Sequence, residues 1–124
     1  MNVLDSSGWL EYFCDGNNAA IFAPIISDSD QLIVPVVSLY EVFKHTVLRQ
    51  GEENALRAVA VMSLGTVIDL TQDIALEAAM LSIKHKLPMA DSLILGTARV
   101  YNAILWTQDD HFRELENVRY ISKK

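Results

Sequence analysis

Cysteine is almost absent from the sequence, because Cys14 is the only one in 124 residues. No disulfide can form within the chain, which favours a reducing compartment, and we expect Cys14 to pack as a small apolar side chain. No apolar run approaches the roughly 20 residues that a membrane-spanning helix needs. The first residues also lack the basic start of a secretory signal. Together these features predict a cytoplasmic protein without a membrane segment.

Basic residues are also scarce. Ten Lys and Arg stand against 16 Asp and Glu, which gives a formal net charge of −6. A chain of this charge is a poor sequence-independent binder of nucleic acid, because phosphate binding needs clustered cations. The exception is a cleft in which several acids hold divalent cations, since phosphate then becomes a natural ligand. The distribution of the acids therefore matters more than their sum.

Apolar residues are plentiful: 51% of the chain is hydrophobic and 21% is charged. This balance is typical of a globular protein with a core and excludes disordered or low-complexity architectures. We find no linker, repeat or biased segment. The length and composition predict a single domain over residues 1–124.

Short apolar runs alternate with longer amphipathic stretches along the whole chain. We expect strands at 1–4, 31–36, 66–70, 103–106 and 118–121, and helices at 8–14, 19–26, 38–50, 52–64, 71–86, 88–102 and 110–115. Strands that alternate with helices form a mainly parallel sheet covered on both faces. The predicted fold is therefore a three-layer α/β/α sandwich, in which ligands bind beyond the carboxyl ends of the strands.

Four acidic residues lie where such a sheet places its chemistry. Asp5 directly follows the first expected strand, Glu41 lies in the first turn of the helix after the second, and Asp109 follows the fourth. Asp91 lies in the first turn of the helix that Pro88 begins. Because the carboxyl ends of parallel strands share one edge of the sheet, we expect these acids to converge.

Each acid also has a purely structural interpretation. Asp5 can cap the helix that follows it, and Ser38 with Glu41 matches a capping box. Asp91 can complement a helix dipole. Asp109 ends the tripeptide Thr107-Gln108-Asp109, which can begin a helix, as the same tripeptide at Thr71 is expected to do. Singly, these interpretations are favoured, whereas the occurrence of all four acids at such positions favours a shared site.

Bound metal would explain such a cluster. Carboxylates held within a few Å repel one another, and burial raises the pKa of at least one of them. Hard oxygen ligands with waters left in place suit Mg²⁺ or Mn²⁺. Such an ion lowers the pKa of water, orients it and neutralises a phosphate during in-line displacement.

Four motifs in this order resemble the PIN-domain nucleases, in particular the small VapC-type toxins of bacterial and archaeal toxin–antitoxin pairs. The motifs are Val3-Leu4-Asp5-Ser6-Ser7, Ile33-Val34-Pro35 with Ser38-Leu39-Tyr40-Glu41-Val42, Leu87-Pro88-Met89-Ala90-Asp91-Ser92-Leu93-Ile94 with Thr97-Ala98, and Leu105-Trp106-Thr107-Gln108-Asp109-Asp110-His111-Phe112. The resemblance covers the whole chain with no large insertion.

The resemblance implies a catalytic metal site. Its acids would be Asp5, Glu41, Asp91 and Asp109, with hydroxyl support from Ser7 or Thr107. Asp5 and Asp91 would hold Mg²⁺ or Mn²⁺ directly, while Glu41 and Asp109 complete the pocket. The chain departs from the family at Asp110, which stands where a basic or polar residue is common, so Asp110 is an alternative to Asp109. His111, which adjoins this acid pair, is the one histidine that could be a ligand, although a surface-loop position is favoured.

The same resemblance implies a function and partners. The chain would be an endoribonuclease that hydrolyses RNA phosphodiesters with a metal-activated water, acting as the toxin of a type II toxin–antitoxin system. Its partners would be an RNA substrate and a cognate antitoxin protein. We also expect a homodimer, because the helices at 38–64 carry more apolar side chains than one face of a sheet needs.

Two other interpretations remain open. Response-regulator receivers are acidic α/β sandwiches of this length, but they need an acidic pair after the first strand and a lysine after the fifth. Here Asp5 ends the first strand alone, and Asp69 is the only candidate phosphoacceptor. A PIN fold without catalytic activity, used only for binding, is the second alternative.

Overall fold

A five-stranded, all-parallel sheet forms the centre of the structure, a computed structural model that describes residues 1–124. The strands are β1 (Asn2–Leu4), β2 (Leu32–Pro35), β3 (Thr66–Ile68), β4 (Ile104–Thr107) and β5 (Val118–Tyr120). Their order across the sheet is β3-β2-β1-β4-β5. Val3 of β1 pairs with Ile33 on one side and with Leu105 on the other.

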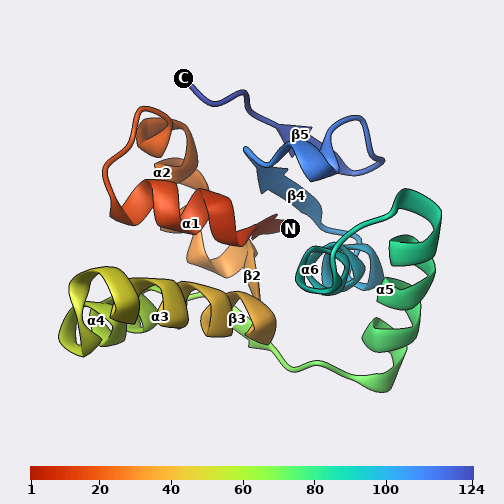
Figure 1. Ribbon diagram of the computed structural model, residues 1–124, viewed down its shortest axis with the longest axis horizontal. Coiled ribbons are helices and arrows are strands. Elements are labelled where there is room, and N and C mark those ends of the chain that lie inside the picture. Colours follow the sequence, from red (N-terminus) through yellow and green to blue (C-terminus); the bar gives the residue numbers. More distant parts are fainter.

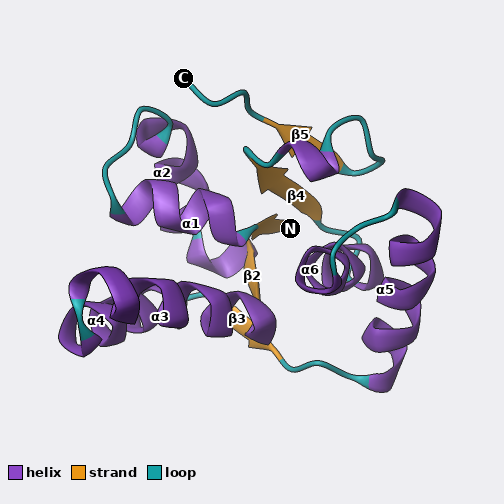
Figure 2. Ribbon diagram, in the orientation of Figure 1, coloured by secondary structure: helices purple, strands orange, loops and turns teal.

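Six α-helices connect and flank the strands (Figure 2). They are α1 (Ser6–Phe13), α2 (Ala19–Ser27), α3 (Val36–Gln50), α4 (Glu52–Met62), α5 (Gln72–His85) and α6 (Met89–Val100). Two short 3₁₀ turns, η1 (Ser29–Gln31) and η2 (Asp110–Phe112), precede β2 and follow β4. None of the helices combines the length and the apolar character that crossing a membrane requires.

The helices form a layer on each side of the sheet (Figure 1): α1 to α4 lie on one side, and α5 with α6 on the other. Strand side chains alternate between the two faces, so Leu4 and Val34 pack toward the first layer, whereas Val3, Ile33 and Leu105 pack toward the second. Residues of both faces are buried, as expected for a parallel sheet. The expected α/β/α sandwich is confirmed.

Two local expectations are wrong. The helix expected at residue 38 begins at Val36, because Pro35 ends β2 and stands directly before the first turn of α3. Ser38 is therefore inside the helix, fully buried, and is not the start of a capping box. Cys14 is exposed at the end of α1 and does not pack in the core.

Candidate functional site

At β1 the order of the strands reverses, so that the connections on its two sides run toward opposite edges of the sheet. From β1 the chain proceeds to β2 and β3 on one side, and it returns to β4 and β5 on the other. In open α/β sheets such a switch point, beyond the carboxyl ends of the strands, is where ligands bind. Asp5 follows β1 and Asp109 follows β4, so the two acids flank this point.

Asp5 is the most buried acid, with 2% of its surface exposed. Its Oδ1 accepts hydrogen bonds from the backbone of Gly8 at 3.0 Å and from the Ser7 hydroxyl at 2.8 Å. Its Oδ2 accepts a hydrogen bond from the Thr107 hydroxyl at 2.8 Å. The bond from Gly8 makes Asp5 the N-cap of α1, so the capping interpretation is correct. The two hydroxyls fix the carboxylate beyond what a cap requires.

Burial raises the pKa of Asp5 to about 7, and the nearby carboxylate of Asp109 adds to the rise. The hydrogen bonds from Ser7, Thr107 and Gly8 lower the pKa but do not offset the loss of hydration. An acid with such a pKa is held in an environment that favours a proton or a cation beside it. Perturbed carboxyl groups of this kind are common at functional sites.

Glu41 reaches the site from α3. Its Oε1 accepts a hydrogen bond from the Ser6 hydroxyl at 2.6 Å, which ties α3 to the first residue of α1. Glu41 therefore does not bond back to its own helix terminus, as a capping box would require. Burial is the main cause of the raised pKa of Asp91, and repulsion from the Glu41 carboxylate adds to it.

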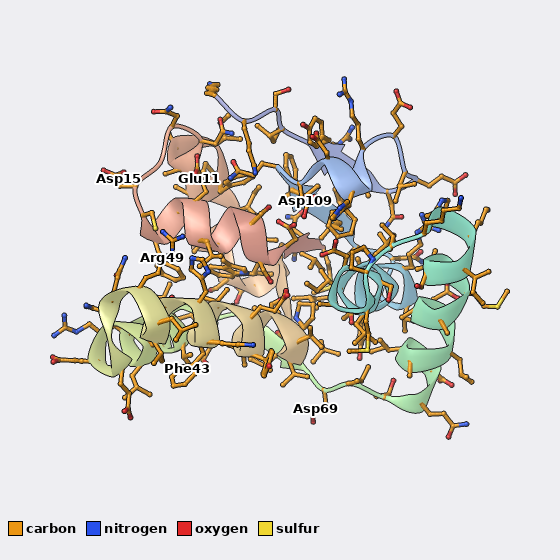
Figure 3. All side chains as sticks on the ribbon, in the orientation of Figure 1. Glu11, Asp15, Phe43, Arg49, Asp69 and Asp109 are labelled. Atoms are coloured by element: carbon orange, nitrogen blue, oxygen red, sulfur yellow. The ribbon has the colours of Figure 1, made fainter.

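Asp91 and Asp109 come together with a histidine. His111 Nδ1 lies 2.9 Å from Asp91 Oδ2 and 3.3 Å from Asp109 Oδ1. Burial is the main cause of the raised pKa of Asp91, the hydrogen bond with His111 opposes it, and repulsion from Asp109 adds to it. Asp109 projects from the loop after β4 toward the middle of the molecule (Figure 3).

The structure brings two of the four expected acids, Asp91 and Asp109, together with His111, with one ligand atom from each within 4.8 Å of the others. Asp5 and Glu41 are not members of that group: Asp5 is joined to Asp109 through Thr107, and Glu41 is bonded to Ser6. Asp110, the alternative to Asp109, is directed elsewhere, since its Oδ1 accepts a hydrogen bond from the Tyr120 hydroxyl at 2.5 Å. Both residues expected to give hydroxyl support, Ser7 and Thr107, bond to Asp5. Thr107 also accepts a hydrogen bond from the backbone of Asp109 at 2.9 Å, which links two of the acids.

Sequence reasoning missed two contributors. The sequence assigns no role to Ser6, and its hydrogen bond to Glu41 spans 35 positions, which no local pattern reveals. His111 is exposed, as expected, but its contacts with both Asp91 and Asp109 were not predicted. In the structure it belongs to the acid cluster.

The largest hollow of the surface lies elsewhere. A cavity of about 410 Å³ opens between α5 and α6, with a lining that includes Ala75, Ala79, Met89 and Leu93. It contains no charged side chain, so it offers nothing to a metal ion or a phosphate. The candidate site is therefore the edge of the sheet that carries Asp5, Glu41, Asp91 and Asp109, called the acid edge below.

The chain matches the sequence model of one protein family, the PIN domain, over residues 3–118. No curated protein matches it. The family match spans all four acids and both supporting hydroxyls.

Solved structures share the fold at low sequence identity. A toxin–antitoxin complex from Klebsiella pneumoniae has 22% identity over 100% of both chains, with a TM-score of 0.83. VapBC2 from Rickettsia felis, bound to a DNA fragment from its promoter, has 14% identity over 99% of this chain and 98% of that one, with a TM-score of 0.77. VapC20 from Mycobacterium tuberculosis, a toxin that cleaves the sarcin–ricin loop, has 17% identity over 83% and 85%, with a TM-score of 0.69.

Replacing Asp5 by Asn is expected to reduce the loss of folding stability that accompanies a rise in pH. The folded pKa of about 7 lies above the ordinary value of 3.8, so the folded state binds the proton more tightly. This stabilising contribution is complete below about pH 4 and is lost as the pH rises to about 7, at a cost of about 2–4 kcal/mol. Asn keeps an acceptor for the cap and carries no charge.

Urea unfolding in metal-free buffer at about pH 5 and about pH 8 measures this difference. The parent should lose stability at the higher pH, while Asp5→Asn should lose clearly less and be more stable than the parent there, with the remaining loss due to the raised pKa values of Asp91 and His111. Asp110→Asn, the matched control, should keep the slope of the parent. A variant Asp5→Asn that is less stable than the parent at both values would show that the carboxylate acts only as a structural cap.

Proposed function

Because the chain belongs to the PIN domain family, we propose that it is a metal-dependent endoribonuclease that hydrolyses RNA phosphodiesters. The observation that supports the proposal is the group of Asp91 and Asp109 with His111, whose ligand atoms lie within 4.8 Å of one another, together with the link from Asp109 through Thr107 to the buried Asp5. Clustered carboxylates are costly without a counter-charge, and two of these have a raised pKa for that reason and because of burial.

The donor set fits a hard divalent cation. All four side chains offer carboxylate oxygens, which are the preferred ligands of Mg²⁺ and Mn²⁺. Asp5, Asp91 and Asp109 would hold the ion, with Glu41 completing the pocket. When bound, such an ion lowers the pKa of water and neutralises charge on the phosphate.

The remaining residues hold the acids in place. Ser7 and Thr107 each donate a hydrogen bond to Asp5, so its carboxylate plane is fixed from both oxygens. Ser6 orients Glu41. A site whose ligands are set by such contacts needs little rearrangement when an ion binds.

The receiver alternative does not agree with the topology. Receivers have the strand order 2-1-3-4-5, which places the third strand beside the first. Here β3 is an edge strand and β2 separates it from β1. Asp69, exposed after β3, lies far from Asp109 (Figure 3), so no phosphoacceptor stands near Asp5. A PIN fold without activity is not favoured either, because none of the four acids is replaced.

We extend the proposal to a cytoplasmic type II toxin that is held inactive by an antitoxin. One of the structurally similar proteins is a toxin–antitoxin complex by its description, and another is a toxin. The acid edge of a chain with net charge −6 would accept an extended partner segment with arginine or lysine, through charge-assisted hydrogen bonds. An amphipathic partner helix could cover apolar surface along α3 and α4.

A homodimer is part of the same proposal. Not every apolar side chain of the helices at 38–64 can contribute to a dimer interface, since Val42 and Met62 are fully buried within the chain. A second exposed apolar surface lies on α5, where Leu76, Met80 and Ile83 are each at least 61% exposed. Exposed apolar surface of this kind is typical of an interface.

Cleavage of single-stranded RNA in Mg²⁺ or Mn²⁺ tests the nuclease directly. Asp91→Asn is expected to lower the cleavage rate at least about 100-fold, because it removes a proposed metal ligand. Asp110→Asn is the matched control, since it removes an adjacent charge that faces Tyr120, and it should cleave at nearly the parental rate. Equal cleavage by both variants, or parental cleavage in excess chelator, would contradict a metal site at Asp91.

Growth of cells that express the chain tests the toxin. We expect arrest with the unaccompanied parent, and normal growth with Asp5→Asn or when the small protein encoded beside it is co-expressed. The reason is that free nuclease activity on cellular RNA is harmful, whereas a bound partner covers the acid edge. Healthy growth in all three cases at comparable soluble expression would argue against a toxin.

A further inference from the structure

The turn after β4 is built so that His111 faces the acid cluster. Asp109 caps this turn, because its Oδ1 accepts a hydrogen bond from the backbone of His111 at 2.9 Å. On either side of the histidine the turn is anchored: Phe112 is fully buried, and Asp110 is bonded to the Tyr120 hydroxyl. The backbone of the turn is therefore anchored on both sides of His111, more than half of whose side chain is exposed.

The donor atoms of this cluster have the spacing of metal ligands. Nδ1 of His111 lies 2.9 Å from Asp91 Oδ2 and 3.3 Å from Asp109 Oδ1, and one ligand atom from each of the three residues lies within 4.8 Å of the others. In an octahedral site with bonds near 2.1 Å, neighbouring ligand atoms are about 3 Å apart. The two separations from Nδ1 of His111 are close to that value.

We propose that Nδ1 of His111 is a nitrogen ligand of the divalent ion, completing a mixed set with Asp91 and Asp109. The inference rests on the proposed metal-dependent function and goes beyond it, because the resemblance provides acids only. Its chemical consequence is a metal preference. Carboxylates suit Mg²⁺ and Mn²⁺ alike, whereas an imidazole nitrogen favours transition metals. This chain should therefore prefer Mn²⁺ to Mg²⁺ more strongly than an all-carboxylate site does.

A simpler role for the same geometry is a hydrogen bond alone. A protonated His111 could donate to Asp91 and act as a counter-charge for the acids. The two roles differ in a measurable way. A nitrogen ligand places ¹⁴N in direct contact with the bound ion, whereas a hydrogen-bonded imidazolium is displaced by it or remains outside the coordination sphere.

Pulsed electron paramagnetic resonance of the full chain with bound Mn²⁺ distinguishes these roles. We expect ¹⁴N coupling to the ion in the parent, loss of that coupling in His111→Gln, and retention in His85→Gln, the matched control at the end of α5. Titrations should show that His111→Gln weakens Mn²⁺ binding about tenfold and Mg²⁺ binding much less.

The outcomes separate this inference from the proposal on which it rests. Mn²⁺ that binds to the parent and is lost in Asp91→Asn, but shows no ¹⁴N coupling, would overturn His111 as a ligand and leave the metal site intact. Coupling that persists in His111→Gln would overturn it equally. If the folded parent binds no Mn²⁺ at millimolar concentration, both this inference and the metal-dependent nuclease are overturned.

Discussion

Like-charged carboxylates held together at one edge of a parallel sheet are the constraint on which the rest of the site depends. Asp5 is almost completely buried, and this burial raises its pKa to about 7. The pKa of Asp91 is raised as well, mainly by burial, and repulsion from Asp109 and Glu41 adds to the rise. A fold gains no stability from such a group in its ionised form. The arrangement is understandable if the site is organised for a cation that binds after folding.

The strand order and a few hydroxyl groups hold these carboxylates in place. The order β3-β2-β1-β4-β5 places the ends of β1 and β4 beside each other, so Asp5 and Asp109 converge although 104 positions separate them. Thr107 joins them, because it donates to Asp5 and accepts from the backbone of Asp109. His111 then contacts Asp109 and Asp91. Loss of any one acid therefore changes the environment of the others, and substitutions at the cluster should not act additively.

The fold was predictable from the sequence because strand and helix periods differ clearly along this chain, and alternation implies a parallel sheet. The four acids were predictable from their places after strands and at a helix start. The partners of those acids were not. Ser6 contacts Glu41 because α1 packs on α3. Helix α3 begins at Val36, earlier than expected, because Pro35 ends the preceding strand. The role of His111 depends on the anchoring of Phe112 in the core, which only the folded chain reveals.

The central claim is that Asp5, Asp91 and Asp109, with Glu41 beside them, form a single site for a divalent cation. Anomalous diffraction from crystals of the protein grown with Mn²⁺ tests it most directly. We predict a strong peak at the switch point of the sheet, about 2.0–2.3 Å from carboxylate oxygens of Asp5 and Asp91. The claim would be contradicted by crystals in which Mn²⁺ occupies only other surface sites, with the carboxylates of this edge unchanged and far from any peak.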